Sequence, residues 1–211
     1  MDASVARLKE LEGKLETIVK RDFAHKNDGH EPGHPARVCK MAMHLQTREG
    51  GDIVVLTIAA YLHDYHRVAG DTHNCACQPD ESLDKVKKIV AELDLGLSAL
   101  QVQKVLDCVN YHNLGPKSTP KGARCIEVAV IQDADTLDDS GATGIIRNLR
   151  YSGAHSVPLE KEIEHIFRDN VRAIGIGHKL NTATAKTIAE KRLTFMVDFF
   201  RRYAEEERGA L

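Results

Sequence analysis

Apolar side chains recur at three- and four-residue steps along most of the chain, and this spacing constrains the fold more than any other feature. A period of 3.6 residues places such side chains on one face of a helix. Val5, Leu8, Leu11 and Leu15 predict an amphipathic helix over residues 3–23. Further helices are predicted over residues 35–48, 81–94, 99–112, 124–137, 141–151, 159–173 and 182–207. Because clear alternating strand patterns are absent, the sequence predicts an all-α protein.

The segment after Gly50-Gly51 is the most apolar part of the chain. Asp52 is placed to cap a helix over residues 52–66, in which positions 53–62 are apolar on nearly every side. A helix without a polar face is buried by its neighbours, so we expect this one at the centre of a helical bundle. A buried strand is the competing interpretation, but the segment is long for a strand. The apolar run is too short to span a bilayer.

Composition narrows the class of protein further. The 211 residues are 42% hydrophobic, which suits one domain with its own core. A formal charge of −2 gives no general attraction to nucleic-acid polymers or to anionic membranes. Five scattered cysteines are typical of a reducing compartment, and the polar N-terminal residues do not resemble a signal peptide. We therefore expect a cytoplasmic monomer or homodimer that binds a small molecule.

Histidine is frequent, with eleven residues, and several histidines stand beside acidic residues where an apolar helix meets a loop. Because several helices can converge at such points, these polar side chains are expected to meet in one site. They are His30, His34, His63, Asp64, His112, Asp133, Asp135 and Asp138. Cys75 and Cys77, close to His73, could bind a soft metal, but no second thiol pair completes a structural zinc site.

Burying two carboxylates and two imidazoles together is costly unless a cation pairs with them. Mixed nitrogen and oxygen ligands suit one divalent transition metal, namely Mn²⁺, Fe²⁺, Co²⁺, Ni²⁺ or Zn²⁺. Four protein ligands on a six-coordinate ion leave positions for water and substrate, as in a metal hydrolase. The alternative for each residue alone is a helix cap or an ordinary buried side chain, and Asp133, Asp138 and Asp139 could simply end a helix.

The order of these residues resembles the H…HD…D signature of the HD-domain metal-dependent phosphohydrolase superfamily, and most closely its bacterial YedJ- and YpgQ-like subgroup. Residues 30–38 are similar to the subgroup's HDxxHxxRV motif, and residues 59–64 to its AALLHD segment. Residues 132–147 resemble QDADxLDAxGAxGIAR, and residues 182–192 resemble TxxAxxxAxxR. The shorter stretches 77–82 and 111–112 also match. The motifs cover about residues 25–200, so the resemblance implies one HD domain over 1–211, with the helix over 3–23 packed on it.

The resemblance implies an all-α HD fold whose metal is held by His34, His63, Asp64 and Asp135. Asp135 is preferred to Asp133 because the family ligand occupies the ADxL position. The substrates of related enzymes are nucleotides or other small phosphate esters, cleaved as monoesters or with release of pyrophosphate. The expected activity is therefore phosphohydrolysis by attack of a metal-activated water on phosphorus.

Other residues match motif positions around the expected site. Asp64, or His112 through a water, is the candidate proton acceptor. His30 and Arg37 are further catalytic candidates, and Arg37 could pair with a phosphate or with a ligand carboxylate. The candidates for substrate binding are Arg147, Lys117, Lys121 and His66.

The chain departs from its relatives in two places. Family members often carry an Asp and an aromatic residue in the first motif, where this chain has Glu31, Pro32 and Gly33. After the HD pair come Tyr65, which could replace a stacking ring, and His66, which could shuttle a proton.

Two other functions remain open at this point. A di-iron oxygenase of the same superfamily needs two more histidines, of which His112 could be one. His73 follows the HD pair too closely to be a comfortable second. The other is a non-catalytic protein that binds a metal or a nucleotide.

Overall fold

The computed structural model describes residues 3–25, 31–69, 78–175 and 179–210, and these contain helices, turns and bends without a strand. This confirms the predicted all-α fold. The α-helices are α1 (Ala3–Asp22), α2 (Gly33–Glu49), α3 (Ile53–Leu62), α4 (His66–Ala69), α5 (Leu83–Glu92), α6 (Ala99–Tyr111), α7 (Ile126–Asp138), α8 (Gly141–Ala154), α9 (Leu159–His165), α10 (Ala173–Gly175) and α11 (Ala183–Glu207). Short 3₁₀ turns form η1 (Pro79–Ser82) and η2 (Lys121–Ala123), and a π-helical stretch forms η3 (Ile166–Arg172).

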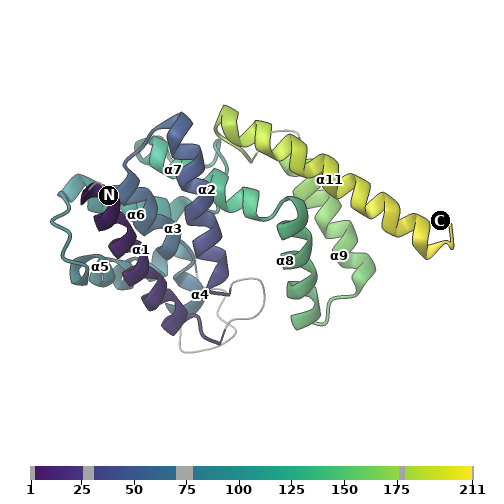
Figure 1. The fold of residues 1–211 in the computed structure, drawn as a ribbon, viewed down its shortest axis with the longest axis horizontal. Coiled ribbons are helices and arrows are strands. Elements are labelled where there is room, and N and C mark those ends of the chain that lie inside the picture. The colour runs from purple at the N-terminus through teal and green to yellow at the C-terminus, as the bar shows by residue number, and fades with distance from the viewer. Residues whose placement is uncertain (1–2, 26–30, 70–77, 176–178, 211) are drawn as a thin grey trace.

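The apolar helix α3 is the centre of the bundle, as its sequence predicts. Every residue from Val55 to Leu62 is buried, and α3 packs against α1, α2, α6 and α7 (Figure 1). Its start is fixed by Asp52, whose Oδ1 accepts hydrogen bonds from the backbone N–H groups of Val54 at 2.9 Å and Val55 at 3.2 Å. No helix in the described ranges is both long and apolar enough to cross a membrane.

Two helices end earlier than their apolar patterns predict. The helix expected over 52–66 stops at Leu62, and residues 63–65 form a turn before α4 begins at His66. The helix expected over 159–173 becomes π-helical after His165. The first break matters for function because it places His63 and Asp64 at the end of the most buried helix. Apolar periodicity does not locate such a break, because it indicates which face of a helix is buried and not the residue at which the backbone turns.

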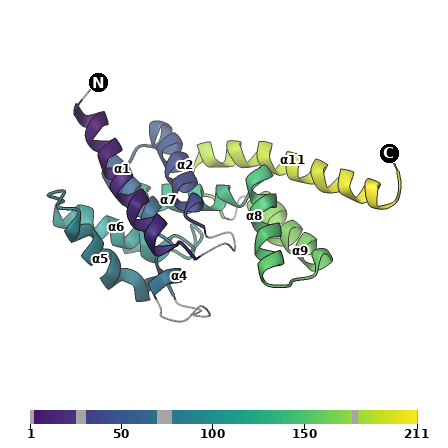
Figure 2. The ribbon, with the colours of Figure 1, turned by 60° about the horizontal axis from the view of Figure 1, so that its bottom comes forward.

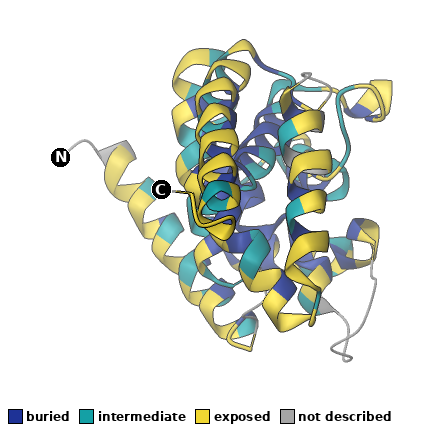
Figure 3. Cartoon of the chain, turned by 90° about the vertical axis from the view of Figure 1, so that its right-hand side faces the viewer, coloured by how far each residue is buried: buried dark blue, intermediate teal, exposed yellow. Residues whose placement is uncertain are grey.

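Helices α8, α9 and α11 form a second group at the other end of the molecule from α1 and α5 (Figures 1 and 2). Only one stripe of α11 is buried, formed by Ala185, Ala189, Leu193, Met196 and Phe200. Figure 3 views the molecule from the C-terminal side. In the helices nearest the viewer, most of the residues on the near side are exposed.

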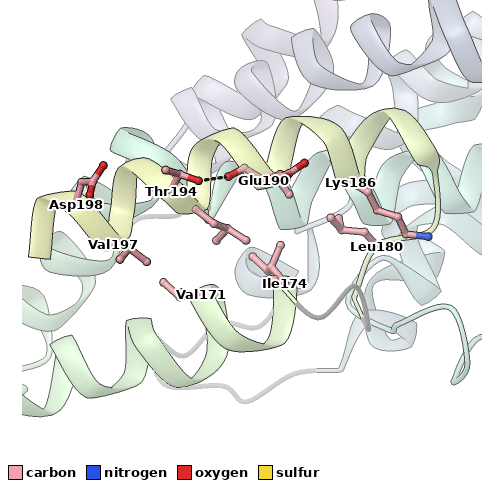
Figure 4. Close-up of a pocket in the computed structure, with 11 residues that line it drawn as sticks. Val171, Ile174, Leu180, Lys186, Glu190, Thr194, Val197 and Asp198 are labelled. Atoms are coloured by element: carbon pink, nitrogen blue, oxygen red, sulfur yellow. Dashed lines mark hydrogen bonds between the residues drawn. The ribbon is translucent and has the colours of Figure 1, made fainter. Parts of the chain in front are cut away.

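A groove of about 750 Å³ lies between α11 and the segment formed by η3 and α10 (Figure 4). Its apolar lining includes Val171, Ile174, Leu180, Leu193 and Val197. On the α11 side of the groove, the hydroxyl of Thr194 donates to the carbonyl of Glu190 one turn earlier in the same helix. The described residues that line this groove include none of the His and Asp residues singled out above.

The turn between α7 and α8 brings backbone unusually close to backbone. A Cβ atom on Gly144 would lie 2.3 Å from both the carbonyl carbon and the carbonyl oxygen of Asp139, far inside van der Waals contact. Only glycine fits there, which explains the second glycine of the Gly141-Ala-Thr-Gly144 sequence. The close approach fixes the end of α7, the helix that carries Asp135.

We therefore expect Gly144→Ala to lower the free energy of unfolding by about 2 kcal/mol, because the clash is with backbone that cannot rotate away. Gly153→Ala is the matched control in the same helix. A Cβ there meets nothing within 4 Å, so we expect no loss and a gain of up to about 1 kcal/mol from helix propensity. Urea unfolding followed by circular dichroism measures both values. Equal stability of the two variants would contradict the close approach.

Candidate metal centre

Side chains from four parts of the bundle converge beside the centre of the fold. His34 is the second residue of α2, His63 and Asp64 lie in the turn after α3, and Asp135 lies on α7. His112 directly follows the last residue of α6. Each stands where a buried helix begins or ends, or on its inward face, so the packing of α2, α3, α6 and α7 sets their relative positions.

Four of these residues surround one point, and we refer to His34, His63, Asp64 and Asp135 as the His–Asp cluster. His34 Nε2 lies 3.3 Å from Asp135 Oδ1 and 3.4 Å from Asp64 Oδ2. His63 Nε2 lies 3.6 and 3.7 Å from the same two oxygens. The two Nε2 atoms are 3.1 Å apart. Ligands about 2.1 Å from one cation are about 3.0–3.4 Å apart at octahedral or tetrahedral angles, which is close to these separations.

The ring orientations of the two histidines are fixed by their Nδ1 atoms. His63 Nδ1 lies 2.8 Å from the carbonyl of Ala60, and His34 Nδ1 lies 2.8 Å from Asp138 Oδ2. Because both partners only accept hydrogen bonds, each Nδ1 carries a proton, and in a neutral ring the Nε2 lone pair is left facing the cluster. Two lone pairs and two carboxylates around one point form a donor set that fits a divalent cation.

Electrostatics within the cluster favour a positive charge at the same point. Burial by itself would lower the pKa of His34, but Asp135, Asp138 and Asp64 raise it well above its usual range. Burial would raise the pKa of Asp64, yet Arg67 and His63 hold it well below its usual range. The pKa of Asp135 is likewise held low, against burial, by His34 and His63.

Asp138 supports the cluster from behind, which the sequence alone did not reveal. Its carboxylate accepts hydrogen bonds from His34 Nδ1 and, at 3.0 Å, from Arg37 Nε, and Arg147 Nη1 lies 3.0 Å from it. Such outer partners orient metal-binding imidazoles and raise their basicity. Spacing could have found it, because Asp138 follows Asp135 by three residues and so shares a helix face with it.

Four other predicted residues lie close to Asp64 or to Asp138. His112 Nε2 lies 3.5 Å from Asp64 Oδ1, and His66 Nε2 lies 4.0 Å from the same oxygen. Burial lowers the pKa of His66 to about 4, so its ring is neutral near pH 7. Arg37 and Arg147 are brought to Asp138 rather than to the cluster itself.

Lys117 and Lys121 are exposed, and within the described residues no hydrogen bond or ion pair joins either of them to the cluster. His30, His73, Cys75 and Cys77 lie outside the described residues.

Two other candidates, Asp133 and Tyr65, make contacts within the fold and do not join the cluster. Both oxygens of Asp133 are used at the start of α11, where they accept from the backbone N–H groups of Asn181 at 2.7 Å and Thr182 at 2.8 Å. Tyr65 was a candidate to stack a base, but its side chain is fully buried, its hydroxyl donates to Asp22, and its ring packs edge-on against Phe23. That interpretation of Tyr65 was wrong, because the break after Leu62 turns its ring into the core.

We expect Asp138→Asn to weaken metal binding by about 10- to 100-fold, because the amide no longer supplies a charged acceptor for His34 Nδ1. Asp139→Asn is the matched control: the next residue also pairs with Arg147, at 2.7 Å, but its side chain is 47% exposed. A change below about threefold is expected for the control. Calorimetric titration of metal-free protein with Mn²⁺ measures both constants, and equal effects would contradict the supporting role of Asp138.

Comparison with known proteins agrees with this geometry. The HD domain model matches residues 33–139, a range that contains the whole cluster and His112. The Bacillus subtilis protein YpgQ is 27% identical over 208 residues, which are 96% of this chain and 96% of that protein.

Solved structures show the same architecture. Bacillus subtilis YpgQ in complex with ADP aligns with a TM-score of 0.68 at 25% identity, over 93% of this chain and 97% of that chain. An HD-superfamily hydrolase from Bacillus thuringiensis aligns with a TM-score of 0.70 at 27% identity, over 95% and 98% of the two chains. Since the HD domain model spans half of its length, this chain belongs to the HD domain family.

Proposed function

We propose that the protein is a metal-dependent phosphohydrolase that acts on a nucleotide or another small phosphate ester. The observation that carries the proposal is the convergence of His34, His63, Asp64 and Asp135 on one point, with all four donor atoms 3.1–3.7 Å from neighbours in the set. When bound, a divalent cation would lower the pKa of a water molecule and polarise a phosphoryl oxygen.

The cluster is closed on most sides, and its exposure favours one direction of approach. The side chains of His34, His63 and Asp64 are at most 4% exposed, whereas that of Asp135 is 23% exposed. A phosphate would therefore approach along the Asp135 edge. Exclusion of bulk water from the other sides strengthens the interaction of the cluster with a charged substrate.

Proton transfer is assigned to Asp64 and His112, which face each other at 3.5 Å. The Nδ1 of His112 lies 2.7 Å from the carbonyl of Val109, which fixes the proton on Nδ1 and leaves Nε2 as the basic atom. Burial alone would lower the pKa of His112, and the carboxylate of Asp64 raises it. A proton taken up at Nε2 would therefore be stabilised by Asp64.

Charge around the site is compatible with a phosphorylated substrate. Arg37 and Arg147 hold Asp138, so their proposed role is to position the cluster, and Lys117 and Lys121 are the proposed contacts to the outer part of the substrate. The ADP bound to Bacillus subtilis YpgQ supports a nucleotide as the class to test first. His30 is a further proposed catalytic residue.

The experiment is a screen for released phosphate and pyrophosphate over nucleotides and sugar phosphates, with Mn²⁺, Co²⁺ or Ni²⁺ added. We expect His63→Ala and Asp135→Ala each to lower kcat/KM by about 100-fold or more, because each removes a ligand that binds and orients the cation.

His155→Ala is the control variant, since the exposed His155 lies at the end of α8, where its ring hydrogen-bonds to the carbonyl of Tyr151 and stacks on the Tyr151 ring. Its activity should equal that of the wild type. Full activity in both cluster variants would overturn the site. Metal binding without turnover of any substrate would instead favour a binding protein.

A further inference from the structure

A small pocket rich in cationic side chains lies where α2, α8 and α11 meet, beside Asp138 and outside the His–Asp cluster. Its volume is about 230 Å³, and the described residues that line it are Arg37, Lys40, Met41, Asp138, Thr143 and Arg192. We call it the Arg192 pocket. Lys40 follows His34 by six residues on α2, which is about 9 Å along the helix axis. The pocket is therefore a separate place from the point on which the cluster converges.

Positive charge exceeds negative charge in the Arg192 pocket, since three cationic side chains and one carboxylate line it. That carboxylate, Asp138, is already used by other cations. Arg37 Nε and Nη2 donate to its two oxygens, each at 3.0 Å, and Arg147 Nη1 lies 3.0 Å from it. Lys40 and Arg192 form no ion pair with any of the described residues. The pocket thus keeps two positive charges for which the described part of the chain supplies no counter-ion.

Arg192 is held in position while most of its donor groups stay available. Its Nη1 donates to the carbonyl of Leu137 at 2.6 Å, which uses one of the five N–H groups of a guanidinium. Its stem lies against Gly141, where a Cβ atom would be 3.2 Å from Cγ of Arg192, so the glycine leaves room for the stem. Burial lowers the pKa of Arg192, against the opposite effect of Asp138. A partly buried guanidinium in this state is stabilised by an anion.

Size and chemistry limit the class of anion. Pockets for drug-sized ligands have volumes of roughly 300–1,000 Å³, so a pocket of about 230 Å³ is too small to enclose a whole nucleotide. The guanidinium of Arg192, the ammonium of Lys40 and the hydroxyl of Thr143 are all hydrogen-bond donors on its lining. Donors of these kinds bind the oxygens of phosphate and sulfate groups. A carboxylate-sized or tetrahedral oxyanion fits the volume, and the two unneutralised charges favour a doubly charged one.

We propose that the Arg192 pocket binds a small tetrahedral oxyanion of the phosphate type. Arg192 and Lys40 contact the anion, and Arg37 remains paired with Asp138. The proposal does not rest on the proposed function, because no residue of the His–Asp cluster lines the pocket and no metal takes part. Asp138 borders the pocket and also accepts from His34 Nδ1, so the bound anion lies next to a residue that orients the cluster.

The experiment titrates inorganic phosphate into the full-length protein after a chelator has removed metal, because a bound cation would itself take up phosphate. Amide chemical shifts in NMR spectra measure the dissociation constant, and we expect one ion per chain with a constant on the order of 1 mM. Arg192→Gln should weaken binding by about tenfold or more, since it removes a charge-assisted donor at a partly buried position. Lys40→Gln should weaken it by about threefold, because water screens the exposed ammonium.

Two variants serve as controls. Lys88→Gln matches Lys40→Gln, since Lys88 is an exposed lysine on α5 that also forms no ion pair with a described residue. His63→Ala changes the cluster and leaves the Arg192 pocket intact. Both should bind phosphate as the wild type does. ADP added to the phosphate-saturated protein should leave the ion bound, because the occupant is a free ion. Displacement by ADP would overturn that source and assign the pocket to the phosphate group of a nucleotide.

Three results would overturn the site itself. One is the absence of saturable phosphate binding by the wild type. Another is an equal dissociation constant in the wild type, Lys40→Gln and Lys88→Gln, which decides the question even if Arg192→Gln does not fold. The third is loss of phosphate binding in His63→Ala with binding retained in Lys40→Gln, since that pattern places the ion at the His–Asp cluster.

Discussion

Two imidazole nitrogens held 3.1 Å apart in a buried site are the constraint on which the rest of the centre depends. Neutral lone pairs repel at that distance, so a positive charge must stand between or beside them. The raised pKa of His34 reflects the same demand for positive charge, since three carboxylates stabilise a proton on its ring. A divalent cation meets the same demand with more charge. The surrounding helices hold the two rings in place, and Ala60 and Asp138 set which nitrogen faces inward.

Much of the fold could be predicted because helical periodicity is a local signal. Asp52 predicts where α3 begins, and its cap is present. The break after Leu62 could not be located by periodicity, because periodicity indicates which face of a helix is buried and not where the backbone turns. Its effect on Tyr65 was therefore missed as well. A side chain that periodicity placed on a helix end lies instead inside the core.

The candidate site was predictable in its members but not in its connections. Order and resemblance singled out His34, His63, Asp64 and Asp135, and the structure brings these four together. Neither signal distinguished Asp138 as a partner of His34, because a carboxylate at a helix end also suits a cap. The position of His66 depends on a four-residue helix whose direction follows from the turn before it. Contacts of this kind depend on tertiary packing, which is difficult to predict from one sequence.

Three aspartates of helix α7 have three different roles. Asp133 binds the backbone N–H groups of the two residues before α11, Asp135 belongs to the cluster, and Asp138 accepts from His34 and Arg37. One helix thus connects the docking of the C-terminal helix with the position of a proposed metal ligand. Truncation of the chain before Asn181 would leave the buried carboxylate of Asp133 without its backbone donors, a cost that α7 would have to relieve by shifting or by taking up a proton. A change in the length of the C-terminal segment would therefore also affect the geometry of the His–Asp cluster, in evolution as in engineering.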